Sequence, residues 1–137
     1  MSITEWSNNA PFATDSTKAT GLQLYNSLIV LVTISGQIQL ISSLSGLLLC
    51  EIHAHVRCIG AFDIAPKTGL LVTVSEDSHL RVFRIEETEG DQCKVEHVFQ
   101  TNVTNEMICG VKFLNAAGSK LALCTYESSQ IKVFEQL

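Results

Sequence analysis

Short runs of apolar residues follow one another along this chain, and turn residues separate them. Within many runs, apolar and polar positions alternate with a period of two, which is typical of half-buried β-strands. Asn, Ser and Gly fill the gaps between runs, as in Asn26-Ser27 and Ser45-Gly46. The pattern predicts strands at residues 20–25, 28–34, 37–42, 47–52, 56–64, 70–75, 79–85, 94–99, 107–113, 120–125 and 130–134.

A repeat connects three of these strands. Each copy begins with a small or acidic turn residue, continues as an alternating strand and closes with a large apolar residue. The three copies are residues 35–41, 77–83 and 128–134. Their closing residues, Ile41, Phe83 and Phe134, are 42 and then 51 residues apart. A period of about 40 to 45 residues is typical of four-stranded propeller blades. We interpret the acidic segment 86–92 as a solvated loop that lengthens the second interval.

The repeat predicts an all-β chain with about three propeller blades. The predicted blades span residues 19–52, 53–100 and 101–137, after a polar N-terminal tail at residues 1–18. Because closed propellers have typically 4 to 8 blades, we expect a partial propeller, and its last blade lacks a fourth predicted strand. Two explanations stay open: the chain is a fragment of a longer propeller, or several chains complete a ring. In either case the open blade edges favour self-association or another chain.

Composition agrees with a folded domain and argues against nucleic-acid and membrane partners. The chain has 46% hydrophobic residues and a formal net charge of −5. Because phosphate binding needs clustered Lys and Arg, which this sequence lacks, we expect no nucleic-acid partner. The uncharged stretch between Lys18 and Glu51 is interrupted by Gln, Asn, Ser and Gly, so we expect no membrane span. The N-terminus has no basic residues followed by an apolar stretch, and we expect no signal peptide.

The cysteines indicate a reducing compartment. There are five, an odd number, and none forms a Cys-x-x-Cys pair, so the spacing predicts neither a disulfide framework nor a zinc site. We therefore expect free thiols and a cytoplasmic protein. Cys50, Cys109 and Cys124 lie among apolar residues, whereas Cys93 lies near the acidic segment and is expected to be the most exposed.

The second repeat resembles a WD40 repeat. The resemblance rests on Ala54-His55, on residues 73–77 (Thr-Val-Ser-Glu-Asp) and on Phe83-Arg84. In that family a Gly-His dipeptide opens the repeat and a Trp-Asp dipeptide closes it. This copy departs from the pattern at three of those four positions, because Ala, Phe and Arg stand where the family has Gly, Trp and Asp.

The resemblance implies a β-propeller fold and a structural hydrogen-bond network. His55, Thr73 and Asp77 fall on the positions of that network, whereas Phe83 has no N–H group to donate. A narrower resemblance, to the C-terminal part of a degenerate propeller of that family, covers residues 22–137. It implies that a longer relative would have an N-terminal half that supplies the remaining blades.

His55, Ser75 and Asp77 also name the members of a hydrolase triad. A β-rich ligand-binding or hydrolase-type domain is therefore the alternative function, although no Gly-x-Ser-x-Gly elbow accompanies Ser75. His53 and His55 would share one face of a strand, but two ligands are too few for a structural zinc site. No Gly-rich phosphate loop is present. We expect no catalytic residues, no metal and no cofactor.

A non-enzymatic protein–protein interaction scaffold is the function that these patterns favour. Loops on a rigid β scaffold are common places for partner contacts. By resemblance to WD40 proteins, Glu76 and Glu127 flank turns on one face and could touch a protein partner. The alternative is that both are ordinary solvated acids.

Overall fold

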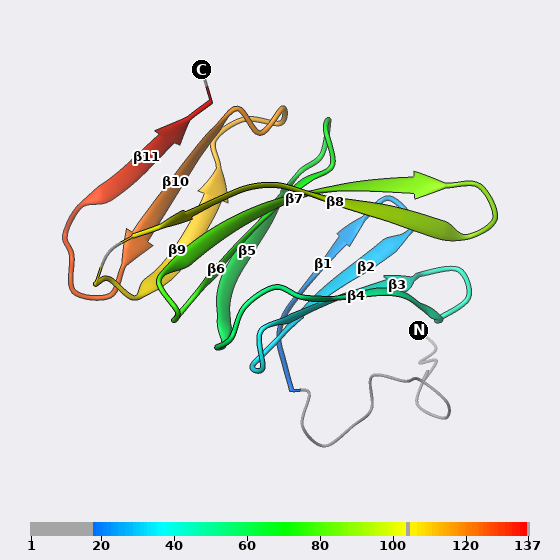
Figure 1. Cartoon of the computed structure of the whole chain (residues 1–137). Coiled ribbons are helices and arrows are strands. Elements are labelled where there is room, and N and C mark those ends of the chain that lie inside the picture. The colour runs from blue at the N-terminus through cyan, green and yellow to red at the C-terminus, as the bar shows by residue number, and fades with distance from the viewer. Residues whose placement is uncertain (1–17, 104, 137) are drawn as a thin grey trace, which may run out of the picture.

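Three antiparallel β-sheets follow one another along the chain and lie side by side (Figure 1). The computed structural model describes residues 18–103 and 105–136, and over these residues it contains eleven strands and no helix. The fold class is therefore all-β, as the sequence predicts. The predicted tail at residues 1–18 lies outside the described residues, except for Lys18.

Each sheet is a meander in which strands that are consecutive in sequence are neighbours. The first sheet contains β1 (Ala19–Tyr25), β2 (Leu28–Thr33), β3 (Gln37–Ser42) and β4 (Leu48–His53). The second contains β5 (Ile59–Ala65), β6 (Leu70–Ser75), β7 (His79–Thr88) and β8 (Gln92–Asn102). The third contains β9 (Ile108–Phe113), β10 (Lys120–Thr125) and β11 (Ile131–Glu135).

One predicted strand begins three residues too early. The prediction placed a strand at 56–64, but β5 begins at Ile59. The chain before β5 crosses the β2–β3 turn instead of entering a ladder, since the backbone N–H groups of Ala54 and His55 both donate to the Gly36 carbonyl oxygen. Val56 and Arg57 are consequently in a loop.

The prediction of a solvated acidic loop at 86–92 is right only for residues 89–91, which form an exposed turn. Residues 86–88 instead extend β7 into the β7–β8 hairpin, in which the ladder places Glu86 opposite Lys94 and Glu87 opposite Cys93. The hairpin reaches the first sheet, as Figure 1 shows, and the Glu87 carboxylate there accepts hydrogen bonds from the Ser27 backbone N–H, at 3.0 Å, and from the Ser27 hydroxyl. Pairing with β8 satisfies the backbone hydrogen-bonding groups of residues 86–88. The composition of this polar segment alone does not reveal the pairing.

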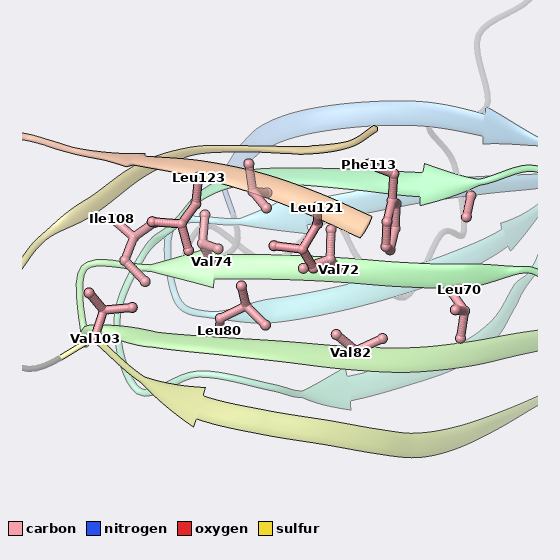
Figure 2. Packing of buried hydrophobic residues seen from close by; sticks show 12 residues of the cluster. Leu70, Val72, Val74, Leu80, Val82, Val103, Ile108, Phe113, Leu121 and Leu123 are labelled. Atoms are coloured by element: carbon pink, nitrogen blue, oxygen red, sulfur yellow. The ribbon is translucent and has the colours of Figure 1, made fainter. Parts of the chain in front are cut away.

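Two hydrophobic cores fill the spaces between the sheets. The first inter-sheet core lies between the first and second sheets and includes Val30, Leu71 and Phe83. The second inter-sheet core lies between the second and third sheets, and Figure 2 shows Val72, Leu80, Leu121 and their neighbours packing there. Within each core most strands contribute alternate residues, whereas β6 is buried along its whole length because its two faces enter different cores.

The three repeat-closing positions differ in how deeply they are buried. Ile41 and Phe83 are buried, whereas Phe134 is partly buried and packs against the second inter-sheet core. Phe134 also lines a cavity of about 260 Å³, together with Val98 and Phe99 of β8. This cavity lies beside β11, which is the outermost strand of the third sheet.

Candidate functional site: a loop rim above a histidine network

His55, Thr73 and Asp77 form a hydrogen-bonded group between the β4–β5 loop, β6 and the β6–β7 turn. The Nδ1 atom of His55 is 3.0 Å from Oδ2 of Asp77, and its Nε2 atom is 2.9 Å from Oγ1 of Thr73. The His55 side chain is 0% exposed and that of Asp77 is 7% exposed. We call these three residues the histidine network. The structure thus brings together the polar residues that the resemblance singled out.

The partners of His55 define its protonation state at neutral pH. The carboxylate of Asp77 can only accept, so Nδ1 carries the hydrogen, and Nε2 accepts the hydrogen of the Thr73 hydroxyl. Burial lowers the pKa of His55 below its ordinary value, and this effect outweighs the opposing influence of Asp77. The imidazole is therefore neutral at pH 7.

Asp77 organises its own turn as well. Its Oδ1 atom accepts the backbone N–H of His79 at 2.9 Å, and its own backbone N–H donates to the Ser75 hydroxyl at 3.2 Å. Burial alone would raise the pKa of Asp77. The hydrogen bond from His79 and the proximity of His55 outweigh burial and lower the pKa below its ordinary value. Asp77 is therefore an ionised structural residue.

Ser75 does not form a nucleophile–base pair with His55. Its hydroxyl donates to the backbone carbonyl of Arg57 at 3.2 Å and accepts from the backbone of Asp77, and the residue is 0% exposed. The Nε2 atom of His55 is occupied by Thr73. This arrangement does not favour the hydrolase alternative, because a serine nucleophile needs a base within hydrogen-bond reach and access to substrate.

The prediction that His53 and His55 share one face is wrong. His53 ends β4 with its side chain 75% exposed and lies 3.3 Å from Glu51, whereas His55 lies beyond the strand and points inward. Across residues 18–103 and 105–136, no cluster of three or more His, Cys, Asp or Glu side chains could hold a metal ion. Over the same residues, no helix is long and apolar enough to cross a bilayer.

Five connecting segments lie at one end of the three sheets, the end that contains the histidine network. Backbone hydrogen bonds link them one after another into a continuous rim. The segments are the β2–β3 turn (34–36), the β4–β5 loop (54–58), the β6–β7 turn (76–78), the described residues of the β8–β9 loop (103 and 105–107) and the β10–β11 loop (126–130). We call this set the loop rim. Backbone hydrogen bonds join its members, including Glu76 N–H to Cys58 O at 3.2 Å and Tyr126 N–H to Met107 O at 2.9 Å.

A glycine is required where the first two segments meet. Gly36 has a φ of 86°, and a Cβ atom at this position would overlap the carbonyl oxygen of His55. Only glycine adopts this backbone conformation and allows this close approach without strain. The contact between the β2–β3 turn and the β4–β5 loop therefore depends on Gly36.

Large apolar side chains point into solvent along the loop rim. Val56 is 89% exposed and Tyr126 is 69% exposed, and Ile34 and Met107 are also exposed. Exposed apolar residues are informative when they gather on one surface, because such gatherings are typical of interaction sites. The sequence analysis missed these residues, since it placed Val56 in a strand and gave Tyr126 no role.

Acidic residues accompany the apolar ones. Glu76 and Glu127, the predicted partner contacts, are both exposed and lie on the loop rim in different segments. Glu127 lines a hollow of about 310 Å³ with Met107 and Tyr126. Glu106, in the same hollow, pairs with Lys132 at 2.7 Å. The rim segments carry four acids, Glu76, Asp77, Glu106 and Glu127, against the single cation Arg57, so the described rim combines exposed apolar side chains with a net negative charge.

Asp63 is a second residue that the sequence analysis missed. This buried acid on β5 accepts hydrogen bonds from the backbone of Phe113 and from the ammonium of Lys112, both on β9. It thereby connects the second and third sheets. The sequence signal that could have identified Asp63 is a lone acid inside an apolar strand, because buried carboxylates nearly always have hydrogen-bond partners.

Comparison with known proteins agrees with the geometry. A family model described as WDR54 matches residues 11–137. WD repeat-containing protein 54 of Mus musculus is 29% identical over 114 residues, covering 82% of this chain and 34% of the relative. The Homo sapiens protein of the same name is 28% identical over 117 residues, covering 85% and 35%. The chain thus spans about a third of the length of these relatives.

A solved structure shows the same arrangement of sheets. The β-propeller domain of Myceliophteria thermophila Cps50 (Swd1) superimposes with a TM-score of 0.79 at 14% identity, covering 94% of this chain and 45% of that chain. At this identity the likeness concerns the fold alone, and it identifies the three sheets as blades of a β-propeller. Together with the family match, it establishes that this chain belongs to the WDR54 family of WD-repeat proteins.

Proposed function

We propose that this chain is part of a non-enzymatic WD-repeat scaffold that binds another protein through the loop rim. The observation that carries the proposal is the exposure of Val56 and Tyr126 on segments that backbone hydrogen bonds hold in place. A fixed loop loses little conformational entropy when it binds, so its apolar side chains contribute to affinity efficiently.

The composition of the rim favours one kind of partner surface. Val56 and Tyr126 would insert into apolar depressions, and Glu76 and Glu127 would face basic residues. Charge complementarity of this kind raises the association rate more than the affinity. We therefore propose a protein partner with an apolar centre and a basic border.

Exposed apolar residues on β1 of the first sheet and on β11 of the third sheet support the proposal that this chain is part of a larger propeller. Leu22 and Leu24 of β1 are 64% and 63% exposed, and Ile131 and Val133 of β11 are 71% and 59% exposed. Because the relatives are about three times as long, we propose that further blades cover these faces in a longer protein. In this chain by itself the same faces favour self-association. Free thiols fit a cytoplasmic location, which is part of the proposal.

Quantitative affinity capture with matched surface variants tests the proposal. Val56→Ser and Tyr126→Ala remove rim side chains, and Leu44→Ser removes an equally exposed apolar side chain, 77% exposed, from the β3–β4 turn at the opposite end of the first sheet. We expect specific protein partners to be lost with both rim variants and retained with Leu44→Ser. Equal capture by all three variants would refute a binding role for the rim.

A further inference from the structure

Two cysteines on the third sheet lie side by side. Cys109 is on β9 and Cys124 on β10, and their Sγ atoms are 3.9 Å apart. Both residues are exposed to solvent. A disulfide needs the two sulfurs to approach to about 2.0 Å, which small side-chain rotations can provide when the thiols already face each other.

The local backbone produces this arrangement. The register between β9 and β10 shifts between Cys124 and Thr125, so Cys109 is placed beside Cys124 rather than directly opposite a partner in the ladder. The residue that pairs with Cys124 is Gly110, and a Cβ atom there would lie 2.6 Å from the Cys124 Sγ atom. The missing side chain of Gly110 therefore leaves the space that the Cys124 thiol occupies.

The other three cysteines have different surroundings. Cys50, Cys58 and Cys93 are only partly exposed, and Cys50 and Cys93 pack against the first inter-sheet core. Burial, with smaller contributions from Cys50 and Glu87, raises the pKa of Cys93 to about 11. Burial and the neighbouring Cys124 also raise the pKa of Cys109, so exposure and the short distance between the two sulfurs, rather than acidity, distinguish the Cys109–Cys124 pair from Cys93.

We propose that Cys109 and Cys124 are a redox modification site that a low-molecular-weight disulfide, such as glutathione disulfide, oxidises reversibly to an intramolecular disulfide. One thiolate attacks the glutathione disulfide, forms a mixed disulfide and releases one glutathione thiolate, which takes up a proton. The second cysteine loses its proton and attacks the protein sulfur of the mixed disulfide, which releases the second glutathione. The protein loses two electrons and two protons, and one glutathione disulfide becomes two glutathione molecules.

The cysteine pair lies next to the loop rim. Cys109 is two residues from Met107, and Cys124 is two residues from Tyr126. The backbone N–H of Tyr126 donates to the carbonyl oxygen of Met107. A covalent bond at this point would join β9 to β10 where both strands enter the rim. The modification itself does not depend on the proposed partner binding. Cytosolic disulfides, where they occur, are commonly transient and redox-sensing.

The test is oxidation of the chain at low micromolar concentration in glutathione buffers, followed by alkylation and peptide mass spectrometry. We expect a peptide pair linked through Cys109 and Cys124, simultaneous loss of both thiols, and recovery of both with dithiothreitol. Cys50 and Cys93 should stay alkylatable under the same conditions. Glutathione attached to single cysteines without an internal bond, or preferential oxidation of Cys93, would overturn the proposal.

Two variants distinguish formation of the internal disulfide from oxidation of single, unpaired thiols. Cys124→Ser should leave the mixed glutathione disulfide on Cys109, because the resolving thiol is missing. Gly110→Ala keeps both thiols but displaces the Cys124 side chain, so the yield of internal disulfide should fall several-fold. Circular dichroism of Gly110→Ala would check that the variant is folded. An unchanged yield in the folded variant would overturn the geometric basis of the site.

Discussion

The carboxylate of Asp63 on β5 accepts the backbone N–H of Phe113 on β9 at 2.7 Å, and this hydrogen bond joins the second and third sheets. The Asp63 side chain is 4% exposed. Its other oxygen accepts from the ammonium of Lys112 at 2.8 Å, although the Lys112 side chain is itself 72% exposed. The two contacts differ in burial and therefore in their expected contribution to stability.

Asp63→Ala should destabilise the chain by about 1.5–3 kcal/mol, because it leaves the buried N–H of Phe113 without its charged acceptor. Lys112→Ala is the matched control. It removes the exposed partner of the same carboxylate and should cost about 0–1 kcal/mol. Urea unfolding followed by circular dichroism measures both values. Equal losses for the two variants would show that the ion pair, rather than the backbone contact, stabilises this junction.

Removal of the imidazole of His55 should have a large effect on stability. His55→Ala leaves the buried Thr73 hydroxyl without a partner and removes the imidazole donor of Asp77, whose Oδ1 atom still accepts the backbone N–H of His79; we expect a loss of about 1–3 kcal/mol. His53→Ala changes an exposed histidine two residues away and should stay within about 0.5 kcal/mol of the wild type. A thermal melt of His55→Ala that matches the wild type would contradict a structural role for the histidine network.

Stability should fall as the pH is lowered below about 6.5, the ordinary pKa of histidine. Burial lowers the pKa of folded His55, Asp77 opposes this, and Arg81 and His79 add to the lowering. The unfolded chain therefore binds a proton at a higher pH than the folded chain does, and acid favours unfolding until the pH reaches the folded-state pKa. A second decline should begin below about 3.9, where unfolded Asp77 titrates before folded Asp77.

Urea midpoints at several pH values measure this dependence. The variant His55→Gln keeps a polar side chain that does not titrate, so the decline that begins near pH 6.5 should be smaller than in the wild type. The decline at lower pH should remain, because Asp77 and other carboxylates still titrate. An identical profile for both proteins between pH 7 and pH 5 would show that His55 does not cause the first decline.

The long β7–β8 hairpin should be held to the first sheet by Glu87. Glu87→Ala removes the acceptor of the Ser27 backbone N–H, so the Ser27 amide should exchange with solvent faster. Glu86→Ala is the control, since Glu86 is an exposed neighbour that pairs with Lys94 across the hairpin. Hydrogen exchange measured by NMR distinguishes the two. Unchanged exchange of Ser27 in Glu87→Ala would mean that the hairpin does not depend on this contact.

The sequence predicts the strands well, because half-buried strands alternate with a period of two and the fully buried β6 is a short apolar run between turn residues. It predicts the histidine network through a family resemblance, since nothing in the local pattern brings His55 and Thr73 together. Prediction from the sequence fails where contacts with a segment distant in sequence determine the local structure or the exposure of a residue. Residues 86–88 of the acidic segment extend β7 because the partner strand continues, and Cys93 becomes less exposed because it packs on another sheet. The pairing of Cys109 with Cys124 likewise depends on strand register.

Self-association through β11 is the prediction that bears most directly on the partial propeller. β11 is the outermost strand of the third sheet in the described part of the chain, and Ile131 and Val133 on it are exposed. Beside it, Phe99 is 49% exposed next to the 260 Å³ cavity. An unpaired edge with exposed apolar residues is a template for another strand. At tens of micromolar, we expect dimers or larger species by size-exclusion chromatography with light scattering.

Charged residues on this edge should reverse the association, because lysine on an edge strand opposes pairing with another strand. The double variant Ile131→Lys with Val133→Lys should therefore shift the chain toward monomer at the same concentration. Leu44→Lys adds positive charge at an equally exposed apolar position away from the edge and should leave the association unchanged. Contact through the outward face of β1 would give a different result, in which the β11 variant still associates and Leu22→Lys with Leu24→Lys does not. A wild-type chain that stays monomeric over the whole concentration range would exclude both contacts, since it would show that neither exposed face drives association by itself.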